Sequence, residues 1–179
     1  MKLRTQALPW LTLMVLSGGT VAAAADDPCT ASKWNLTREH ALFSEAAQSA
    51  AAGRDAASAP DMKAGRLYEL SLSPQDGVKF VVPPGKKAPP DGAFAGLIRL
   101  QVPAAGTYRI SLDQGSWIDV IDHQQIIEAT DFAGLHGCAA PRKIVLYKLP
   151  ARKDLVLQLS GAAKDRVRVT LTPSSAPAP

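Results

Sequence analysis

The segment at residues 106–122, GTYRISLDQGSWIDVID, constrains the fold of this chain more than any other. Apolar residues take every second position within each half, at Tyr108, Ile110, Leu112, Ile118 and Val120. Alternation with a period of two is typical of strands with one buried face. Residues 113–116 between the halves form a turn cluster with a glycine. The pattern predicts a hairpin, and because a hairpin is not stable alone in water, other strands must cover its apolar face.

Similar strand-like segments recur through the rest of the chain. They occupy residues 66–72, 78–82, 94–102, 125–129, 143–149, 154–160 and 166–171. Residues 83–92, PPGKKAPPDG, contain four prolines that cannot donate to a sheet, so this stretch is predicted to be a loop. Many short strands separated by turns predict a mainly β fold, an antiparallel β-sandwich or jelly roll with one N-terminal α-helix.

The helix is expected at residues 38–52, with Thr37 as its N-cap and Glu39 in its first turn. Residues 53–64 lack periodicity and are expected to form a linker. The predicted organisation is a signal peptide (1–25), an N-terminal arm, helix and linker (26–65), a β-sandwich domain (66–172) and a disordered tail (173–179).

The first 25 residues have the pattern of an export signal. Lys2 and Arg4 precede a short apolar run at residues 11–16, and residues 22–25 are alanines that suit a cleavage site. The run is too short for a typical membrane anchor, although an uncleaved anchor is the alternative interpretation. We therefore expect a periplasmic or secreted protein with no transmembrane segment once the signal is removed.

Cys29 and Cys138 are the two cysteines of the chain. In an exported protein such a pair predicts one disulfide. The closed loop of about 110 residues would contribute roughly 4–5 kcal/mol in the chain-entropy model. The alternative is two free or metal-binding thiols, but neither cysteine has a second one at CxxC spacing, so a zinc site is poorly supported.

The charge balance argues against nucleic acid as a partner. The formal net charge of +4 falls to +2 when Lys2 and Arg4 leave with the signal peptide. No basic helix and no aromatic-basic surface is evident in the sequence.

A Gly-x-Tyr-x-Ile-x-Leu strand is followed by a turn and by a strand that carries an aspartate. The residues of this motif are Gly106, Tyr108, Ile110, Leu112 and Asp119. With them, residues 66–172 resemble the small secreted bacterial β-sandwich domains of the pre-peptidase C-terminal kind. The resemblance implies an accessory module that binds polymers or assists secretion and has no catalytic role of its own. The helix expected before the sandwich departs from the family pattern.

Residues 119–136 contain the densest set of possible metal ligands. These are Asp119, Asp122, His123, Glu128, Asp131 and His136. Two imidazoles and a carboxylate at the end of a β-sandwich can hold a divalent metal, so His123 and His136 with Asp131 or Glu128 are the candidate ligands. The alternative is a polar loop in which Asp and His serve turns, because the histidines are thirteen positions apart and no His-x-His occurs.

Trp117, Asp119 and Tyr147 are the candidate binding residues. The alternating pattern places Trp117 on the same face as Asp119, opposite Ile118. If Trp117 and Tyr147 both point outward, they form an aromatic platform for a carbohydrate. In the interpretation that we favour, the N-terminal helix covers Trp117.

These patterns favour an exported, non-enzymatic β-sandwich module that binds an envelope polysaccharide or a protein partner and needs no cofactor. No Gly-x-Ser-x-Gly elbow occurs, and Asp119 and Asp122 face opposite sides of their strand, so no catalytic residues are assigned. One alternative is a metal-dependent enzyme that resembles a cupin-type dioxygenase. Another is a structural subunit of an envelope assembly that makes contact through residues 83–92.

Overall fold

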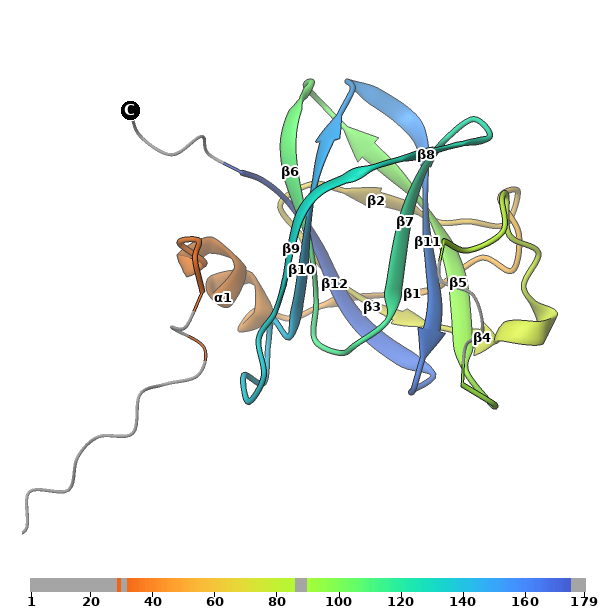
Figure 1. Cartoon of the computed structure of the whole chain (residues 1–179), viewed down its shortest axis with the longest axis horizontal. Coiled ribbons are helices and arrows are strands. Elements are labelled where there is room, and N and C mark those ends of the chain that lie inside the picture. The colour runs from red at the N-terminus through yellow and green to blue at the C-terminus, as the bar shows by residue number, and fades with distance from the viewer. Residues whose placement is uncertain (1–28, 30–31, 86–89, 175–179) are drawn as a thin grey trace, which may run out of the picture.

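The computed structural model describes residues 29, 32–85 and 90–174 (Figure 1). Its elements are α1 (Thr37–Phe43), β1 (Gln48–Ala51), β2 (Asp61–Lys63), β3 (Leu67–Ser71), β4 (Ser73–Pro74), the 3-10 helix η1 (Gln75–Gly77), β5 (Phe94–Val102), β6 (Gly106–Leu112), β7 (Trp117–Asp122), β8 (Gln125–Ile127), β9 (Ala129–Gly134), β10 (Lys143–Leu149), β11 (Arg152–Ala162) and β12 (Arg166–Pro173). The predicted signal peptide and residues 175–179 of the predicted tail lie outside the described residues. The start of that tail is ordered, because β12 includes Pro173 and the N–H of Ser174 donates to the carbonyl of Thr107 (2.8 Å).

The strands form two sheets that pack face to face. The first sheet has the order β1-β3-β12-β6-β10-β9, and the second has the order β2-β5-β11-β7-β8, with β4 also beside β5. The predicted mainly β sandwich with one N-terminal α-helix is therefore confirmed, whereas jelly-roll connectivity stays a prediction. The pairing is antiparallel except for β1 with β3 and β2 with β5, which are parallel. β12 lies between β3 and β6, and β11 lies between β5 and β7.

β6 and β7 do not form the predicted hairpin. β6 pairs with β10 and β12, whereas β7 pairs with β11 and β8 in the other sheet. Residues 113–116 are therefore an arch between the sheets. Asp113 accepts hydrogen bonds from the backbone N–H (2.9 Å) and Nε (3.0 Å) of Arg168, and Gln114 donates its side-chain amide to the carbonyl of Arg166 (2.7 Å). Alternation predicts two half-buried strands, but it fits strands that face each other across a core as well as strands that lie side by side.

The inward-facing rows of both sheets make one main core. Its fully buried members include Ile110, Leu112, Val120, Leu155, Leu157, Val169 and Leu171. Each such side chain contributes about 1.5–3 kcal/mol through removal of apolar surface from water. The rows come from strands in both sheets, so the core depends on pairing between segments that are far apart in the sequence.

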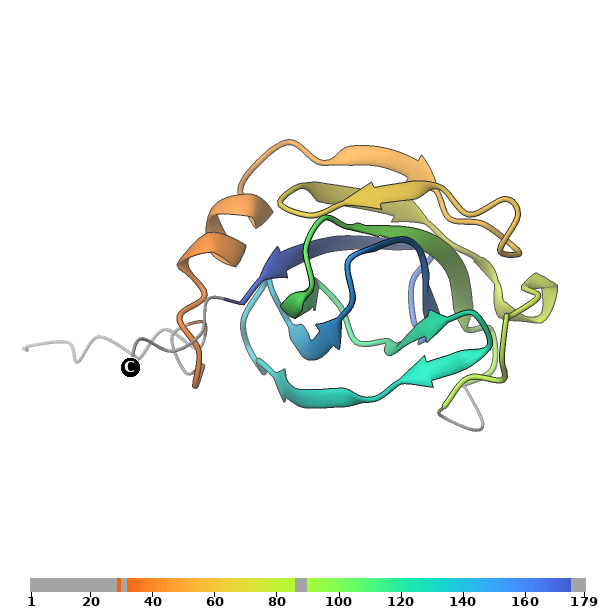
Figure 2. The same ribbon diagram turned by 90° about the horizontal axis from the view of Figure 1, so that it is seen from above.

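The two sheets are also joined along their sides, so that the sandwich approaches a closed ring (Figure 2). β8 pairs with β7, and the chain then crosses to the first sheet, where β9 pairs with β10. On the other side β1 pairs with β3, and Gly53 then bridges Leu97 of β5. Neither β1 nor β9 is predicted by the sequence pattern, because crossing strands are mostly exposed and need no regular alternation. The short strands β2 and β4 also fall in segments without a strand signal.

Glycine is required where β1 turns toward β5. A Cβ added to Gly96 would lie 2.4 Å from the Cβ of Ala52, and a Cβ added to Gly53 would lie 2.6 Å from the backbone of Ala59. Both separations are well below van der Waals contact. The close approach of the two sheets at this corner therefore depends on the missing side chains.

The helix α1 is shorter than expected and is not capped by Thr37. It ends at Phe43, and residues 48–51 form β1 rather than its second half. The N-cap position is Leu36, and the N–H of Thr37 donates to Oδ1 of Asn35 (2.9 Å). The alanine-rich sequence favours a helix, but pairing with β3 overrides that weak local preference.

The helix covers the outer face of the first sheet. Glu39 is fully buried, and its Oε1 accepts a hydrogen bond from the Thr172 hydroxyl and lies 3.2 Å from Nε of Arg109. At the end of the helix, Nη1 of Arg168 donates to the carbonyl of Phe43 (3.1 Å). A buried carboxylate is tolerated because a cation and a hydroxyl compensate for its lost hydration.

Residues 75–85, which we call the strap, cross the outer face of the second sheet. The strand expected at residues 78–82 is not formed. Instead, the fully buried amide of Gln158 accepts the N–H of Val81 (2.7 Å) and donates to the carbonyl of Val82 (3.2 Å). A short apolar run fits a covering segment as well as a strand, so the pattern predicts burial without deciding the conformation.

The N-terminal arm is fastened to the first sheet by the predicted disulfide. Cys29 and Cys138 are bonded, which confirms the pairing. Around it, Trp34 and Leu36 of the arm pack on Ile144, on the outward row of β10. No helix within the described ranges has the length and apolar content needed to cross a bilayer.

Candidate functional site

Trp117, at the start of β7, keeps 37% of its surface exposed. Its indole Nε1 donates to Oδ1 of Asp119 (2.9 Å), and Oδ2 of Asp119 accepts the N–H of Gly85 in the strap (3.0 Å). The two side chains share one face of β7, as predicted, and the buried carboxylate orients the ring. The expectation that the N-terminal helix covers Trp117 is wrong, because α1 packs on β12 in the other sheet.

The two sheets separate next to Trp117. β8 pairs only with the last three residues of β7, so no strand of the described chain lies beside the carbonyls of Ser116 and Ile118 on that side. Side chains of β10 bind these carbonyls instead. The Tyr147 hydroxyl donates to the Ile118 carbonyl (2.9 Å), and Nζ of Lys143 donates to the Ser116 carbonyl. We call this opening, between residues 116–118 and β9, the seam.

Tyr147 does not share an exposed surface with Trp117. It lies on the inward row of β10 with Val145 and is only 2% exposed. Burial and the negative charges of Asp119 and Glu128 raise the pKa of its phenol well above the usual range. The phenol therefore stays protonated at neutral pH and donates its hydrogen bond to the Ile118 carbonyl. The platform of two outward rings is not formed.

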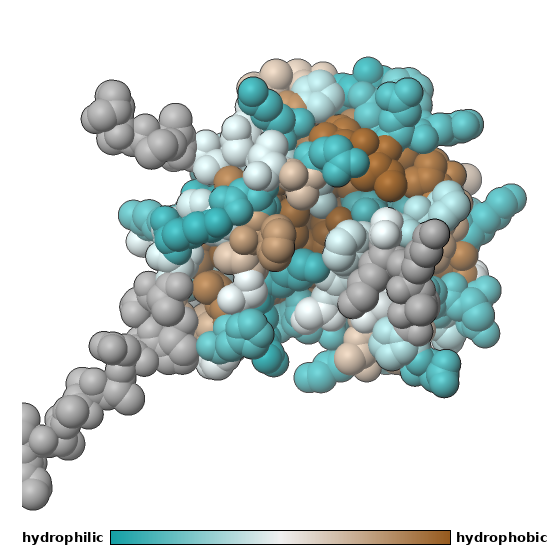
Figure 3. All heavy atoms as spheres, viewed as in Figure 1, coloured by the Kyte–Doolittle hydropathy of each residue, from teal (hydrophilic) through white to brown (hydrophobic). Residues whose placement is uncertain are grey.

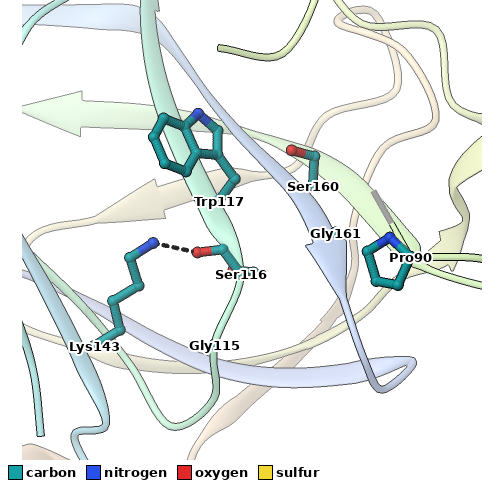
Figure 4. A pocket seen from close by; sticks show the side chains of 7 residues that line it. All are labelled: Pro90, Gly115, Ser116, Trp117, Lys143, Ser160 and Gly161. Atoms are coloured by element: carbon teal, nitrogen blue, oxygen red, sulfur yellow. Dashed lines mark hydrogen bonds between the residues drawn. The ribbon is translucent and has the colours of Figure 1, made fainter. Parts of the chain in front are cut away.

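A cleft of about 280 Å³ opens beside Trp117 at the end of the seam (Figure 4). The ammonium of Lys143 lies 5.3 Å from the centroid of the indole ring. The cleft is lined by Pro90, Gly115, Ser116, Trp117, Lys143, Ser160 and Gly161. These residues offer an aromatic face, a positive charge and hydroxyl groups, and they include no carboxylate, imidazole or thiol. Such a lining is suited to binding a ligand.

The two candidate histidines of the metal site lie in different places. His123 occupies the turn between β7 and β8 with a φ of 59°, and its Nδ1 is 2.7 Å from Oδ1 of Asp122. His136 follows β9, so the whole length of β8 and β9 separates the two imidazoles. Among the described residues, no group of three or more His, Cys, Asp and Glu side chains is placed to hold a metal ion.

The candidate carboxylates have other surroundings. Asp131 accepts a hydrogen bond from Nζ of Lys33 (2.6 Å), which holds the pKa of Asp131 below its usual range. Glu128 is exposed between β8 and β9. The structure therefore brings Trp117 and Asp119 together but does not bring His123, His136, Asp131 and Glu128 together. Of the loop proposed for an envelope assembly, residues 86–89 lie outside the described residues.

Sequence reasoning misses the contribution of the seam to this site. Lys143 begins the inward row of β10, which continues with Val145 and Tyr147. Its position at the edge of the core is the one signal in the sequence that its ammonium reaches the seam. Phe132 has no such signal, because its exposure depends on the separation of two sheets. No protein-family model matches the chain, and comparison with curated proteins and with solved structures also finds no match.

Proposed function

We propose that this chain is an exported, non-catalytic β-sandwich module that binds an envelope polysaccharide or a protein partner at the cleft beside Trp117. The observation that carries the proposal is the exposed indole held in a fixed orientation by buried Asp119. A pre-ordered aromatic ring loses little conformational entropy on binding. The described lining residues offer an aromatic face, an ammonium group and hydroxyl groups, which supports binding of a polar ligand.

Two further observations support the cellular setting of the proposal. The Cys29–Cys138 disulfide is typical of proteins in oxidising compartments, and the first 25 residues have the pattern of an export signal. The resemblance of residues 66–172 to pre-peptidase C-terminal domains also favours an accessory role. A periplasmic or secreted location follows from the proposal.

A co-sedimentation experiment with purified peptidoglycan sacculi tests this function. We expect the chain to be retained, and Trp117→Ala to weaken binding about tenfold or more, as is typical of a central aromatic contact. Ile126→Ala is the matched control, since Ile126 is also 37% exposed but lies outside the cleft. Retention on sacculi that is independent of Trp117, or no retention on sacculi or other envelope polysaccharides, would contradict the polysaccharide form of the proposal. Trp117-dependent retention on a protein bait would favour the protein partner.

A further inference from the structure

Phe132 is the most exposed large hydrophobic residue of the described chain, with 71% of its surface accessible. In the β9–β10 ladder it is paired with Val145, a member of the main core. Directly paired residues point to the same side of a sheet, so Phe132 is on the core-facing side of β9. It is exposed because no described strand of the second sheet lies opposite it at the seam.

Hydrophobic exposure is concentrated on this part of the molecule. Among the described residues, the exposed large hydrophobic ones, Trp117, Ile126 and Phe132, all belong to the continuous run β7–β8–β9. Figure 3, seen from the same side as Figure 1, shows a hydrophobic patch over β8 and the end of β7 beside it, away from the start of β7 where Trp117 stands. Exposed aromatic side chains next to a hollow are a common mark of a binding surface.

A second hollow of about 380 Å³ lies against Phe132. It shares Gly115 and Lys143 with the cleft beside Trp117, so the two hollows adjoin at the seam. We call the two hollows together the seam groove; Trp117 lines one of them and Phe132 lines the other. Glycines at positions 115 and 134 leave its floor without bulky side chains.

The Phe132 end of the groove is basic. Arg142 and His136 line it, both exposed, and none of the described residues that line either hollow is acidic. Arg142 makes no ion pair with any other described residue. A guanidinium binds a carboxylate through two parallel hydrogen bonds, so this end of the groove suits a ligand that carries carboxylates.

The open edge of β9 is poorly suited to an added peptide strand. The N–H of Phe132 donates to Oδ1 of Asp131 (2.8 Å), and Lys33 binds the same oxygen (2.6 Å). Strand addition needs such edge N–H groups for its ladder, and here a side chain already occupies one of them. We infer that the seam groove takes a carboxylate-bearing glycan chain, which contacts Trp117 at one end and Phe132 with Arg142 at the other. This inference rests on the proposed function, because it extends the same cleft.

Titration calorimetry with alginate oligosaccharides of increasing length, and with neutral cello-oligosaccharides for comparison, tests the inference. We expect affinity for the uronate chains to rise with length until both rings are contacted and then to level off. Phe132→Ala and Arg142→Gln should each weaken binding of long uronate chains about tenfold and flatten the dependence on length. Arg142→Gln should leave any binding of neutral chains unchanged. Ile126→Ala is the control, and circular dichroism checks that each variant is folded.

The outcomes separate this inference from the proposed function. Loss of binding in Trp117→Ala, with full binding in Phe132→Ala and Arg142→Gln, would overturn the extended groove and leave the Trp117 cleft in place. Loss in none of the three variants would overturn both. Binding of poly-L-glutamate that depends on Phe132 and Arg142, without binding of uronate chains, would overturn the glycan in favour of an acidic protein segment.

Discussion

The outer faces of the two sheets are both covered, but by segments of different kinds that are held in different ways. On the first sheet the cover is the helix α1, and the buried contact is an ion pair between Glu39 and Arg109. On the second sheet the cover is the irregular strap, and the buried contact is the neutral amide of Gln158. The seven-residue helix satisfies part of its own backbone groups, and the sheet supplies a further donor, Nη1 of Arg168, to the carbonyl of Phe43. The strap lacks even these internal hydrogen bonds at Val81 and Val82, so the sheet supplies partners for an N–H and a C=O group there.

Among the substitutions that compare the two covering segments, Arg109→Met is expected to cause the largest loss of stability. The substitution leaves the buried carboxylate of Glu39 without its cation, and removal of one partner of a buried pair costs about 3–5 kcal/mol. Urea unfolding measures the loss. Removal of both charges in Glu39→Met/Arg109→Met should recover part of it, because no lone buried charge remains. Arg166→Met, which breaks the exposed pair with Glu69, is the control and should cost less than about 1 kcal/mol. Equal losses in Arg109→Met and Arg166→Met would contradict this account of the helical cover.

A smaller and more local effect is expected from Gln158→Met on the second sheet. The substitution keeps the volume of the side chain but removes the partners of the Val81 N–H and the Val82 carbonyl. Val81 and Val82 are only half-buried, so water replaces part of the lost contacts, and we expect a total cost of about 1–3 kcal/mol. Hydrogen exchange should show faster exchange at the amide of Val81, with the amides of α1 as an internal control. Unchanged protection at Val81 would show that the amide does not hold the strap.

The smallest loss of stability at neutral pH is expected from Tyr147→Phe, at the seam. Loss of the hydrogen bond to the Ile118 carbonyl should cost about 1 kcal/mol at pH 7. The wild-type chain should lose further stability as the pH rises above 10. The reason is that the unfolded phenol, with a reference pKa of 10.0, releases its proton while the folded one, whose pKa is raised, retains it. Unfolding curves between pH 8 and pH 11 should show a shallower decline for the variant. An identical decline in both proteins would exclude Tyr147 as its source.

Most strands could be predicted from the sequence, because a half-buried strand must alternate. β5, β6, β7 and β10 have the predicted bounds. The failures have particular causes. The apolar faces of β6 and β7 meet across the core instead of lying side by side, and a period of two cannot distinguish these arrangements. β1 was expected to be helical, because its Gln-Ser-Ala-Ala sequence has no strand preference and the strand exists only through its pairing with β3.

The candidate site was less predictable than the fold. The pairing of Trp117 with Asp119 follows from their spacing of two along one strand. The burial of Tyr147 and the exposure of Phe132 depend on where β8 leaves β7, a tertiary feature with no local sequence signal. The covering segments could not be assigned either, since nothing in the apolar run at 78–82 tells which sheet it will cover.

The positions of β11 and β12 have a consequence for the order in which the molecule can assemble. These two strands come last along the described chain, yet each joins two earlier strands in the interior of its sheet. Until residues 152–173 are available, neither sheet has the strand that joins its earlier strands. A nascent chain that ends earlier should stay unfolded, and a C-terminal truncation before β12 should abolish the native state rather than trim it. Such a topology postpones folding until residues 152–173 have been synthesised, which suits any route that requires an extended chain beforehand.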